Sequence, residues 1–324
     1  MTRPPIPLHL RAEDMSRAVD TLYVRYQLTD LDRQKAFLTD FGLTVAAEDK
    51  GRLLMRGTGP APFIYVAEKG PADRFVGAGL LVSSAEDLDA LARLPGSGPV
   101  EAIDAPGGGR RVRMRMDDGF EIDAVHGLTP AAPLPLADPV AFNAGSEKHR
   151  TNRAIRTRRG IAPAIRLGHF VLHVRDHARA VAWMGERFGL LPSDHLAIPD
   201  QPDSVIGTFL RMNKGPALTD HHCLFILQSE TPGVHHCSFE VQDLEAVMAA
   251  HDHLLHRGYR LDCGVGRHLL GSQIFDYWRD PFGFRVEHYT DGDVVNDAHR
   301  PTVFAGTADQ TTQWGAEPPP EFFQ

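Results

Sequence analysis

Hydrophobic and polar positions repeat a strand-then-helix pattern in both halves of the chain. Residues 23–30 (YVRYQLTD) alternate as a half-buried strand does, and the apolar residues that follow recur at helical spacing until Gly42. Residues 169–176 (HFVLHVRD) do the same, and their helical stretch closes on Gly189. The pattern predicts a strand that feeds a helix in each half.

An aspartate stands between the strand and the helix in both copies, Asp30 in the first and Asp176 in the second. A carboxylate in that position accepts hydrogen bonds from the free backbone N–H groups of the first helical turn. We therefore expect each helix to begin directly after its aspartate.

The correspondence between the halves continues downstream. The paired segments are 77–82 with 236–241, 86–91 with 243–248, and 119–123 with 283–287. The first pair has the pattern of strands, the second that of helices, and the third that of terminal strands after a glycine turn. Two related strand-helix-strand units in one chain predict an α+β fold.

Changes in composition divide the chain into four parts. A Pro- and Ala-rich stretch that turns basic separates the two copies, and the C-terminal residues show no periodicity. We predict an N-terminal domain over residues 1–126, a linker that crosses the surface over 127–164, a C-terminal domain over 165–290 and a tail over 291–324.

Charge and composition exclude several classes of protein. The 324 residues are 42% hydrophobic and 23% charged, and the formal net charge is -8, which gives no electrostatic footprint for nucleic acid. The pattern contains neither a signal-peptide core nor an apolar stretch of membrane-spanning length, so we expect a cytoplasmic protein without a membrane partner. The three cysteines form no CxxC pair, and we expect them in the core.

The 17 histidines are unusual, and their positions in the repeat matter. Aligning the copies sets His169 against Tyr23, His236 against Gly77 and Glu287 against Asp123. Because alternate side chains of a strand share a face, three strands of the second copy can direct two imidazoles and a carboxylate into one cavity. We predict a metal on His169, His236 and Glu287, and none in residues 1–126.

Two histidines and one carboxylate that leave coordination positions open are typical of non-haem Fe(II) oxygenases. The same ligands do not exclude Mn(II). An iron site of this type lets a substrate and O2 bind to one ion.

The stretch from Gly266 to Glu287, with the run FDYWRDPFGFRVE, resembles the signature of the type I extradiol ring-cleavage dioxygenases of the vicinal oxygen chelate superfamily. The histidines at 169 and 236 and their neighbours resemble the other two ligand strands. This resemblance implies a two-domain fold of paired βαβββ modules. It also implies Fe(II), a catechol-type substrate, O2, a ring-opened semialdehyde-type product and a homo-oligomer.

The resemblance also implies three catalytic residues around the metal. His222, in the run DHHCLF, matches the acid-base histidine, although the adjacent His221 remains an alternative. His268 and Tyr277 match positions that hydrogen-bond the bound catechol and oxygen.

Two other functions stay open at this point. The same superfamily includes glyoxalase-type isomerases and lyases, in which a glutamate commonly replaces the first histidine, whereas this chain has His169. It also includes metal-free proteins that bind drugs in the same cavity, and a full ligand set argues against that function.

Overall fold

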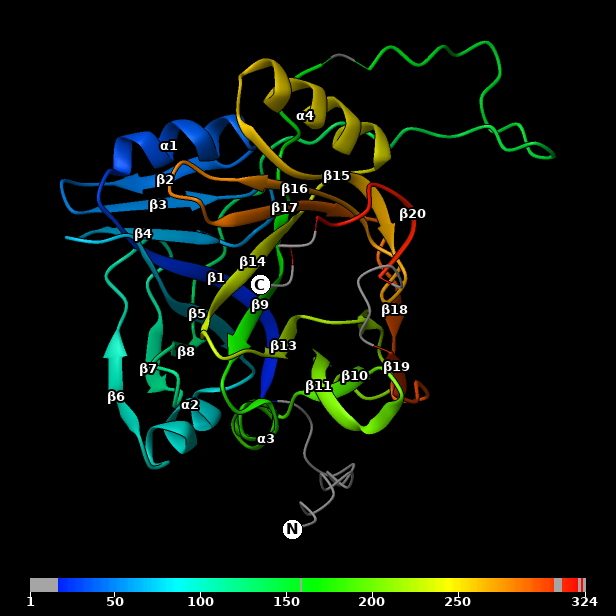
Figure 1. Cartoon of the computed structure of the whole chain (residues 1–324). Helices are drawn as coiled ribbons and strands as arrows, with labels where there is room; N and C mark the ends of the chain where they lie inside the picture. Colours follow the sequence, from blue (N-terminus) through cyan, green and yellow to red (C-terminus); the bar gives the residue numbers. More distant parts are fainter. Residues whose placement is uncertain (1–16, 158, 306–310, 320–321, 323–324) are drawn as a thin grey trace.

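The computed structural model describes residues 17–157, 159–305, 311–319 and 322. Two strongly curved sheets lie side by side, and the helices cover their outer faces (Figure 1). The four helices of these residues are α1 (Leu31–Asp40), α2 (Ala85–Ala92), α3 (His177–Phe188) and α4 (Leu244–His256). The α+β class predicted from the sequence is confirmed.

The N-terminal half forms an eight-stranded sheet in the order β2-β3-β4-β1-β5-β8-β7-β6. Its strands are β1 (Ala18–Leu28), β2 (Thr44–Glu48), β3 (Arg52–Arg56), β4 (Tyr65–Lys69), β5 (Arg74–Val82), β6 (Ser97–Ala102), β7 (Arg110–Arg115) and β8 (Glu121–His126). Along the chain these elements form two successive βαβββ modules.

The C-terminal half forms a ten-stranded sheet in the order β19-β10-β11-β13-β9-β14-β17-β16-β15-β20, and β12 pairs separately with β18. Its strands are β9 (Arg166–Val174), β10 (Leu191–Ile198), β11 (Gln201–Arg211), β12 (Thr219–Asp220), β13 (Leu224–Gln228), β14 (Gly233–Glu240), β15 (Arg260–His268), β16 (Ile274–Arg279), β17 (Arg285–Thr290), β18 (Val294–Val295), β19 (Thr302–Ala305) and β20 (Thr312–Gly315). The tail, which shows no periodicity, thus adds an edge strand at each end of this sheet.

The predicted helix starts are confirmed. Asp30 accepts a hydrogen bond from the backbone N–H of Arg33 at 3.0 Å, and Asp176 accepts one from Arg179 at 3.1 Å. The second helix ends on Gly189 with φ of +70°, a left-handed conformation that glycine adopts without steric cost. These local signals fix where the first strand of each copy ends.

The two halves share one hydrophobic core, which holds the central strands in place. The rings of Tyr26 and Phe284 lie 4.9 Å apart between their centroids, and His288 Nε2 lies 2.6 Å from the carbonyl oxygen of Phe41. All three cysteines are buried, as expected. The N-terminal sheet therefore packs directly behind the strands that carry the predicted ligands.

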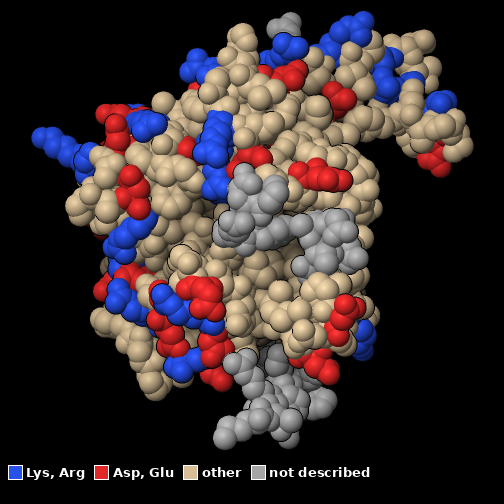
Figure 2. All heavy atoms as spheres, viewed as in Figure 1, with Lys and Arg blue, Asp and Glu red and all other residues tan. Residues whose placement is uncertain are grey.

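The segment between the two halves extends away from the body (Figure 1). Its side chains are largely exposed from residue 135 to 157, and Lys and Arg gather along it on the face shown in Figure 2. Elsewhere on that face the two signs of charge are mixed. Among the described residues, no helix has both the length and the apolar character that crossing a membrane requires.

Candidate metal centre

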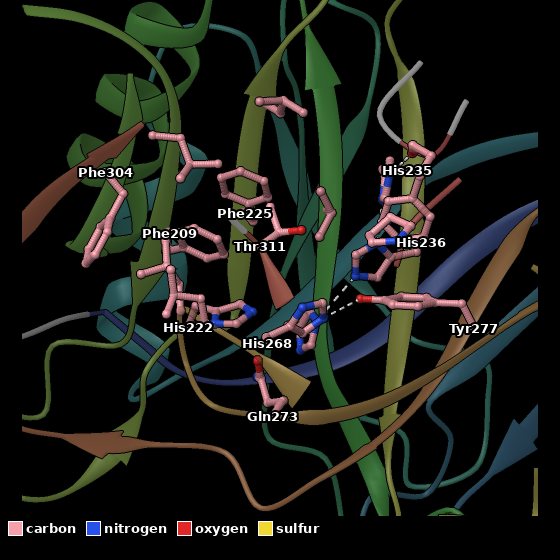
Figure 3. Close-up of a pocket in the computed structure, with 18 of the residues that line it drawn as sticks. Phe209, His222, Phe225, His235, His236, His268, Gln273, Tyr277, Phe304 and Thr311 are labelled. Atoms are coloured by element: carbon pink, nitrogen blue, oxygen red, sulfur yellow. Dashed lines mark hydrogen bonds between the residues drawn. The ribbon is translucent and has the colours of Figure 1, made fainter. Parts of the chain in front are cut away.

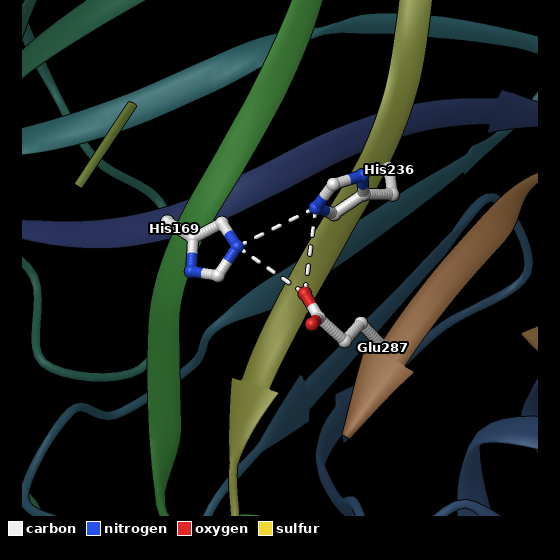
Figure 4. Close-up of side chains that lie close together, drawn as sticks. All are labelled: His169, His236 and Glu287. Carbon is white, nitrogen blue, oxygen red and sulfur yellow. Dashed lines mark hydrogen bonds and ion pairs between the residues drawn. The ribbon is translucent and has the colours of Figure 1, made fainter. Parts of the chain in front are cut away.

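The three predicted metal ligands lie on three neighbouring strands and converge on one point (Figure 4). His169 is on β9, His236 on β14 and Glu287 on β17. His169 Nε2 lies 3.2 Å from Glu287 Oε2, His236 Nε2 lies 3.4 Å from the same oxygen, and the two imidazole nitrogens are 3.4 Å apart. Each of the three residues is at most 6% exposed.

This geometry fits a metal ion. Metal bonds of about 2.1 Å that meet at right angles place ligand atoms about 3 Å apart. No Lys or Arg within the described residues forms an ion pair with Glu287, and its Oε1 has no hydrogen-bond partner there. A fully buried carboxylate without a balancing cation is costly, so the chemistry of this donor set favours a bound cation.

The protonation states suit coordination. Burial alone would raise the pKa of the Glu287 carboxyl, but the surrounding histidines hold that pKa well below its ordinary value. Burial lowers the pKa of His236 to about 4, although Glu287 opposes the shift. A deprotonated carboxylate and a neutral imidazole are the forms that bind a metal.

A cavity opens in front of the three ligands, and the predicted catalytic residues line it (Figure 3). The ring of His222 lies 4.4 Å from that of His169. On another side, His268 Nε2 and Tyr277 Oη are 2.8 Å apart, and His268 Nε2 lies 3.6 Å from Glu287 Oε1. The structure thus brings all six residues together.

The structure places the two adjacent histidines in different surroundings. His222 lines the cavity, whereas His221 points away and places its Nε2 2.8 Å from Asp194 Oδ2. Asp194 is held in turn by the backbone N–H and the hydroxyl of Thr302, at 2.8 and 2.6 Å. The two histidines meet through their Nδ1 atoms at 3.1 Å.

The contacts of His221 bear on the proton positions on His222. Because a carboxylate only accepts, His221 Nε2 carries the proton toward Asp194. In the tautomer in which His221 Nδ1 is the acceptor, His222 donates from its Nδ1 and its Nε2 is unprotonated. Burial lowers the pKa of His222 well below its ordinary value, and the neighbouring His169 and His221 add to that effect. His222 therefore offers a neutral base beside the ligands.

The family match falls on this half of the chain. Residues 166–288 match the Glyoxalase/Bleomycin resistance protein/Dioxygenase superfamily, and the matched region contains all three converging side chains. This half of the chain is therefore similar to that superfamily over residues 166–288.

Relatives within the superfamily are named as extradiol dioxygenases, which confirms the resemblance seen in the motifs. Metapyrocatechase 2 of Cupriavidus necator is 31% identical over 159 residues, which cover 49% of this chain and 46% of that protein. The 2,2',3-trihydroxybiphenyl dioxygenase of Sphingomonas paucimobilis is 28% identical over 290 residues, which cover 85% of this chain and 88% of that protein. The chain thus spans about half the length of the first relative and most of the second.

Solved structures of the superfamily share the whole fold. The Mn(II)-bound glyoxalase from Novosphingobium aromaticivorans superposes with a TM-score of 0.79 at 24% identity, over 96% of this chain and 95% of that one. Homoprotocatechuate 2,3-dioxygenase from Brevibacterium fuscum gives 0.75 at 19% identity, over 98% and 94%. At these identities the likeness shows the fold, and the predicted two-domain vicinal oxygen chelate architecture is confirmed.

Sequence reasoning missed Ser238, which lies between the converging side chains. Its hydroxyl is 2.8 Å from His169 Nε2 and also contacts Glu287 Oε2. The signal was present, because Ser238 follows His236 by two positions in a strand and so shares its face. Serine is too common on strand faces for that signal to stand out.

Sequence reasoning also missed two other parts of the cavity wall. Gln273 lines it, and the Oε1 of its side chain has no hydrogen-bond partner among the described residues. Thr311, Pro318 and Phe322 of the tail line it as well. The carbonyl oxygen of Phe322 lies 2.9 Å from Arg285, so the tail returns to the site across a long stretch of sequence.

A second group of possible metal ligands, Asp194, His221 and His299, lies behind the cavity. Its atoms already have hydrogen-bond partners: Asp194 holds His221 and Thr302, and His299 Nε2 lies 2.9 Å from the carbonyl oxygen of Ser193. The group is therefore satisfied without an ion. Through His221, which contacts both Asp194 and His222, the group holds His222 in position.

Proposed function

We propose that this chain is an extradiol dioxygenase that cleaves a catechol-type ring beside its diol, with O2, to a ring-opened semialdehyde-type product. The observation that carries the proposal is the convergence of His169, His236 and Glu287 at a cavity that also holds His222. The dioxygenase names of the relatives point the same way.

We propose Fe(II) on the three converging side chains. When bound, it would supply open coordination positions at which the diol and O2 meet, and the cation would make the diol more acidic. The ligand set also accommodates Mn(II), which the similar glyoxalase structure contains. Metal analysis of the purified protein decides between the two.

The chain's own residues would manage the protons. The unprotonated Nε2 of His222 takes a proton as the diol binds and returns it to the reacting oxygen later in the reaction. The His221–Asp194 pair keeps His222 in this tautomer, in the way that a carboxylate orients a catalytic imidazole.

Tyr277 and His268 would hold the substrate oxygen on the opposite side. Burial raises the pKa of Tyr277 well above its ordinary value, and the Glu287 carboxylate adds to that effect, so the phenol keeps its proton. A protonated phenol donates a hydrogen bond to an oxygen that gains negative charge.

Metal-dependent isomerisation is the second candidate, because the glyoxalase structure shares the fold. That chemistry needs a metal and a base but consumes no O2. The expected homo-oligomer and the expected cytoplasmic location also stay predictions, and light scattering and cell fractionation test them.

The proposed function is tested by product analysis. The iron-loaded protein with catechol and labelled O2 should consume oxygen and give a coloured semialdehyde whose mass equals catechol plus O2. A colourless cis,cis-muconate, or a reaction that proceeds equally well without oxygen, contradicts the proposal. Two variants serve as controls: His236→Ala, which removes a proposed ligand, should lose the activity, and Asp123→Asn, at a matched position of the first copy, should keep it.

A further inference from the structure

The cavity in front of the ligands has two chemically distinct walls (Figure 3). One wall is polar and contains the histidines, Tyr277 and Gln273. The other wall is apolar and is built mainly by one packed cluster of side chains. The cluster residues that line the cavity are Val171, Leu196, Phe209, Phe225, Leu227, Leu270 and Phe304.

The apolar wall begins one ring away from the ligands. The ring of His222 lies 4.4 Å from that of His169 and 5.0 Å from that of Phe209. Phe209 in turn stacks on Phe225 at 4.0 Å, with the rings 10° from parallel. A diol held at the three ligands beside His222 would therefore direct a ring substituent onto this wall.

No charged side chain stands on the wall. Among the described residues that line the cavity there is no Lys, Arg, Asp or Glu. The segments 306–310 and 320–321, which adjoin lining residues in the sequence, contain no Lys or Arg either. A negatively charged substituent thus finds no cation among these residues.

The guanidinium of Arg285 contacts the lining residue His235, but its interactions are already satisfied. It is 3% exposed, pairs with Asp262 at 2.5 Å and donates to the carbonyl oxygen of Phe322 at 2.9 Å. The ring of Phe322 covers it at 3.9 Å. Arg285 therefore supports the wall rather than binding an anion in the cavity.

We propose that the cavity selects catechols whose ring substituent is apolar and uncharged, such as an alkyl chain or a second ring, and that it rejects a carboxylate substituent. This inference rests on the proposed function. Its physical basis is that an apolar substituent gains by leaving water for the phenylalanine and leucine surface. A carboxylate on the same wall would lose its hydration without gaining a partner.

Isosteric substrate pairs test the selection. The pairs are 4-isobutylcatechol with 3,4-dihydroxyphenylacetate and 3-isobutylcatechol with 2,3-dihydroxyphenylacetate, and unsubstituted catechol is the reference. Each pair differs in charge but little in shape. In whichever pair the iron-loaded enzyme cleaves faster, we expect kcat/KM to be higher for the neutral member than for the carboxylate member by roughly 100-fold or more. Calorimetric titration of the enzyme with each substrate in the absence of O2 should give a lower Kd for the neutral member than for the carboxylate member.

Phe304 offers a charge-insertion variant. It lies half-buried on the edge strand β19, where a long side chain can reach solvent when the cavity is empty. Phe304→Arg should lower the ratio of kcat/KM between the neutral and the carboxylate substrate by at least about 10-fold. The reason is that the added guanidinium attracts the carboxylate and raises kcat/KM for that substrate. Phe304→Gln, which adds polarity without charge, should leave the carboxylate member as poor a substrate as before.

The outcomes separate the two proposals. Efficient cleavage of the carboxylate members by the wild-type enzyme would overturn the inference and leave the dioxygenase function standing. Equal ratios in Phe304→Arg and Phe304→Gln would also overturn it. If iron-loaded enzyme cleaves none of the catechols, the proposed function fails, and the anaerobic Kd ratio alone then decides whether the cavity selects by charge.

Discussion

In the N-terminal half, Tyr23, Gly79 and Asp123 occupy the strand register in which the C-terminal half has His169, Ser238 and Glu287. Tyr23 pairs with Gly79 and Gly79 with Asp123, just as His169 pairs with Ser238 and Ser238 with Glu287. The fourth position is Arg113 in one half and Tyr277 in the other. One backbone arrangement thus carries two sets of side chains.

The side chains of the first set bind to one another. Tyr23 donates to Asp123 Oδ2 at 2.7 Å, and Arg113 Nε donates to Asp123 Oδ1 at 2.9 Å. A Cβ on Gly77, the counterpart of His236, would lie 1.7 Å from the backbone oxygen of Glu121. No imidazole fits there without a shift of the strands.

The difference between the two buried carboxylates is instructive. Asp123 and Glu287 are both 0% exposed, but Asp123 is neutralised by an arginine of its own sheet. The described polar residues that contact Glu287 are histidines, a serine and a tyrosine. The comparison indicates that the cation of the second copy comes from outside the chain. Four groups of substitutions test the assignments made to the two copies.

Removal of a ligand should have the largest effect. Glu287→Gln or His236→Ala should abolish iron binding and lower turnover by more than about 10³-fold, because the remaining donors cannot hold the ion in place. Asp123→Asn, the counterpart in the first copy, should keep one iron per chain. Metal analysis of the folded variants measures the iron content, and oxygen uptake measures turnover. Iron retained by His236→Ala would contradict the statement that the second copy holds the metal through this residue.

Replacement of His222 should slow the chemistry without releasing iron. His222→Asn should lower kcat by about 10²- to 10⁴-fold, since the base is lost but no ligand is. Steady-state kinetics with the iron content as a control measure it. If His221→Asn shows the larger loss instead, the roles given to the two histidines are reversed.

Loss of the internal cation should destabilise the first copy. Arg113→Met leaves Asp123 buried without its main partner, which should lower the free energy of unfolding by about 2–3 kcal/mol, a value reduced because Arg113 is partly exposed. Denaturant unfolding measures it, and adding Asp123→Asn should restore most of the loss. An unchanged midpoint in the single variant would show that the arginine does not balance the charge.

The smallest expected effect is at Asp194. Asp194→Asn should lower kcat by about 10- to 100-fold, because the amide no longer enforces the tautomer of His221 and hence of His222. KM and iron content should stay as in the wild type, a pattern that a merely structural role would not give. A parallel loss of iron or of thermal stability would assign Asp194 to the fold instead.

Much of this arrangement could be predicted from the sequence because it depends on short-range patterns. The repeat, the helix caps at Asp30 and Asp176 and the shared face of each ligand strand follow from periodicity within a few residues. The structure places His169, His236 and Glu287 together because strand parity and the repeat together constrain them.

The features that were missed depend on contacts between distant segments. The contact that distinguishes His221 from His222 is made by Asp194, which lies 27 residues from His221 in the sequence. The return of Phe322 to Arg285 and the edge strands β19 and β20 likewise follow from packing of the tail, which has no periodic pattern. No local signal in the sequence encodes such contacts.

Anomalous diffraction at the iron edge, from crystals of iron-loaded protein, would show directly whether the second copy alone holds a metal. We expect one strong peak per chain, between His169 Nε2, His236 Nε2 and Glu287. A peak between Tyr23 and Asp123, or one at Asp194 and His299 in place of the predicted position, would contradict it.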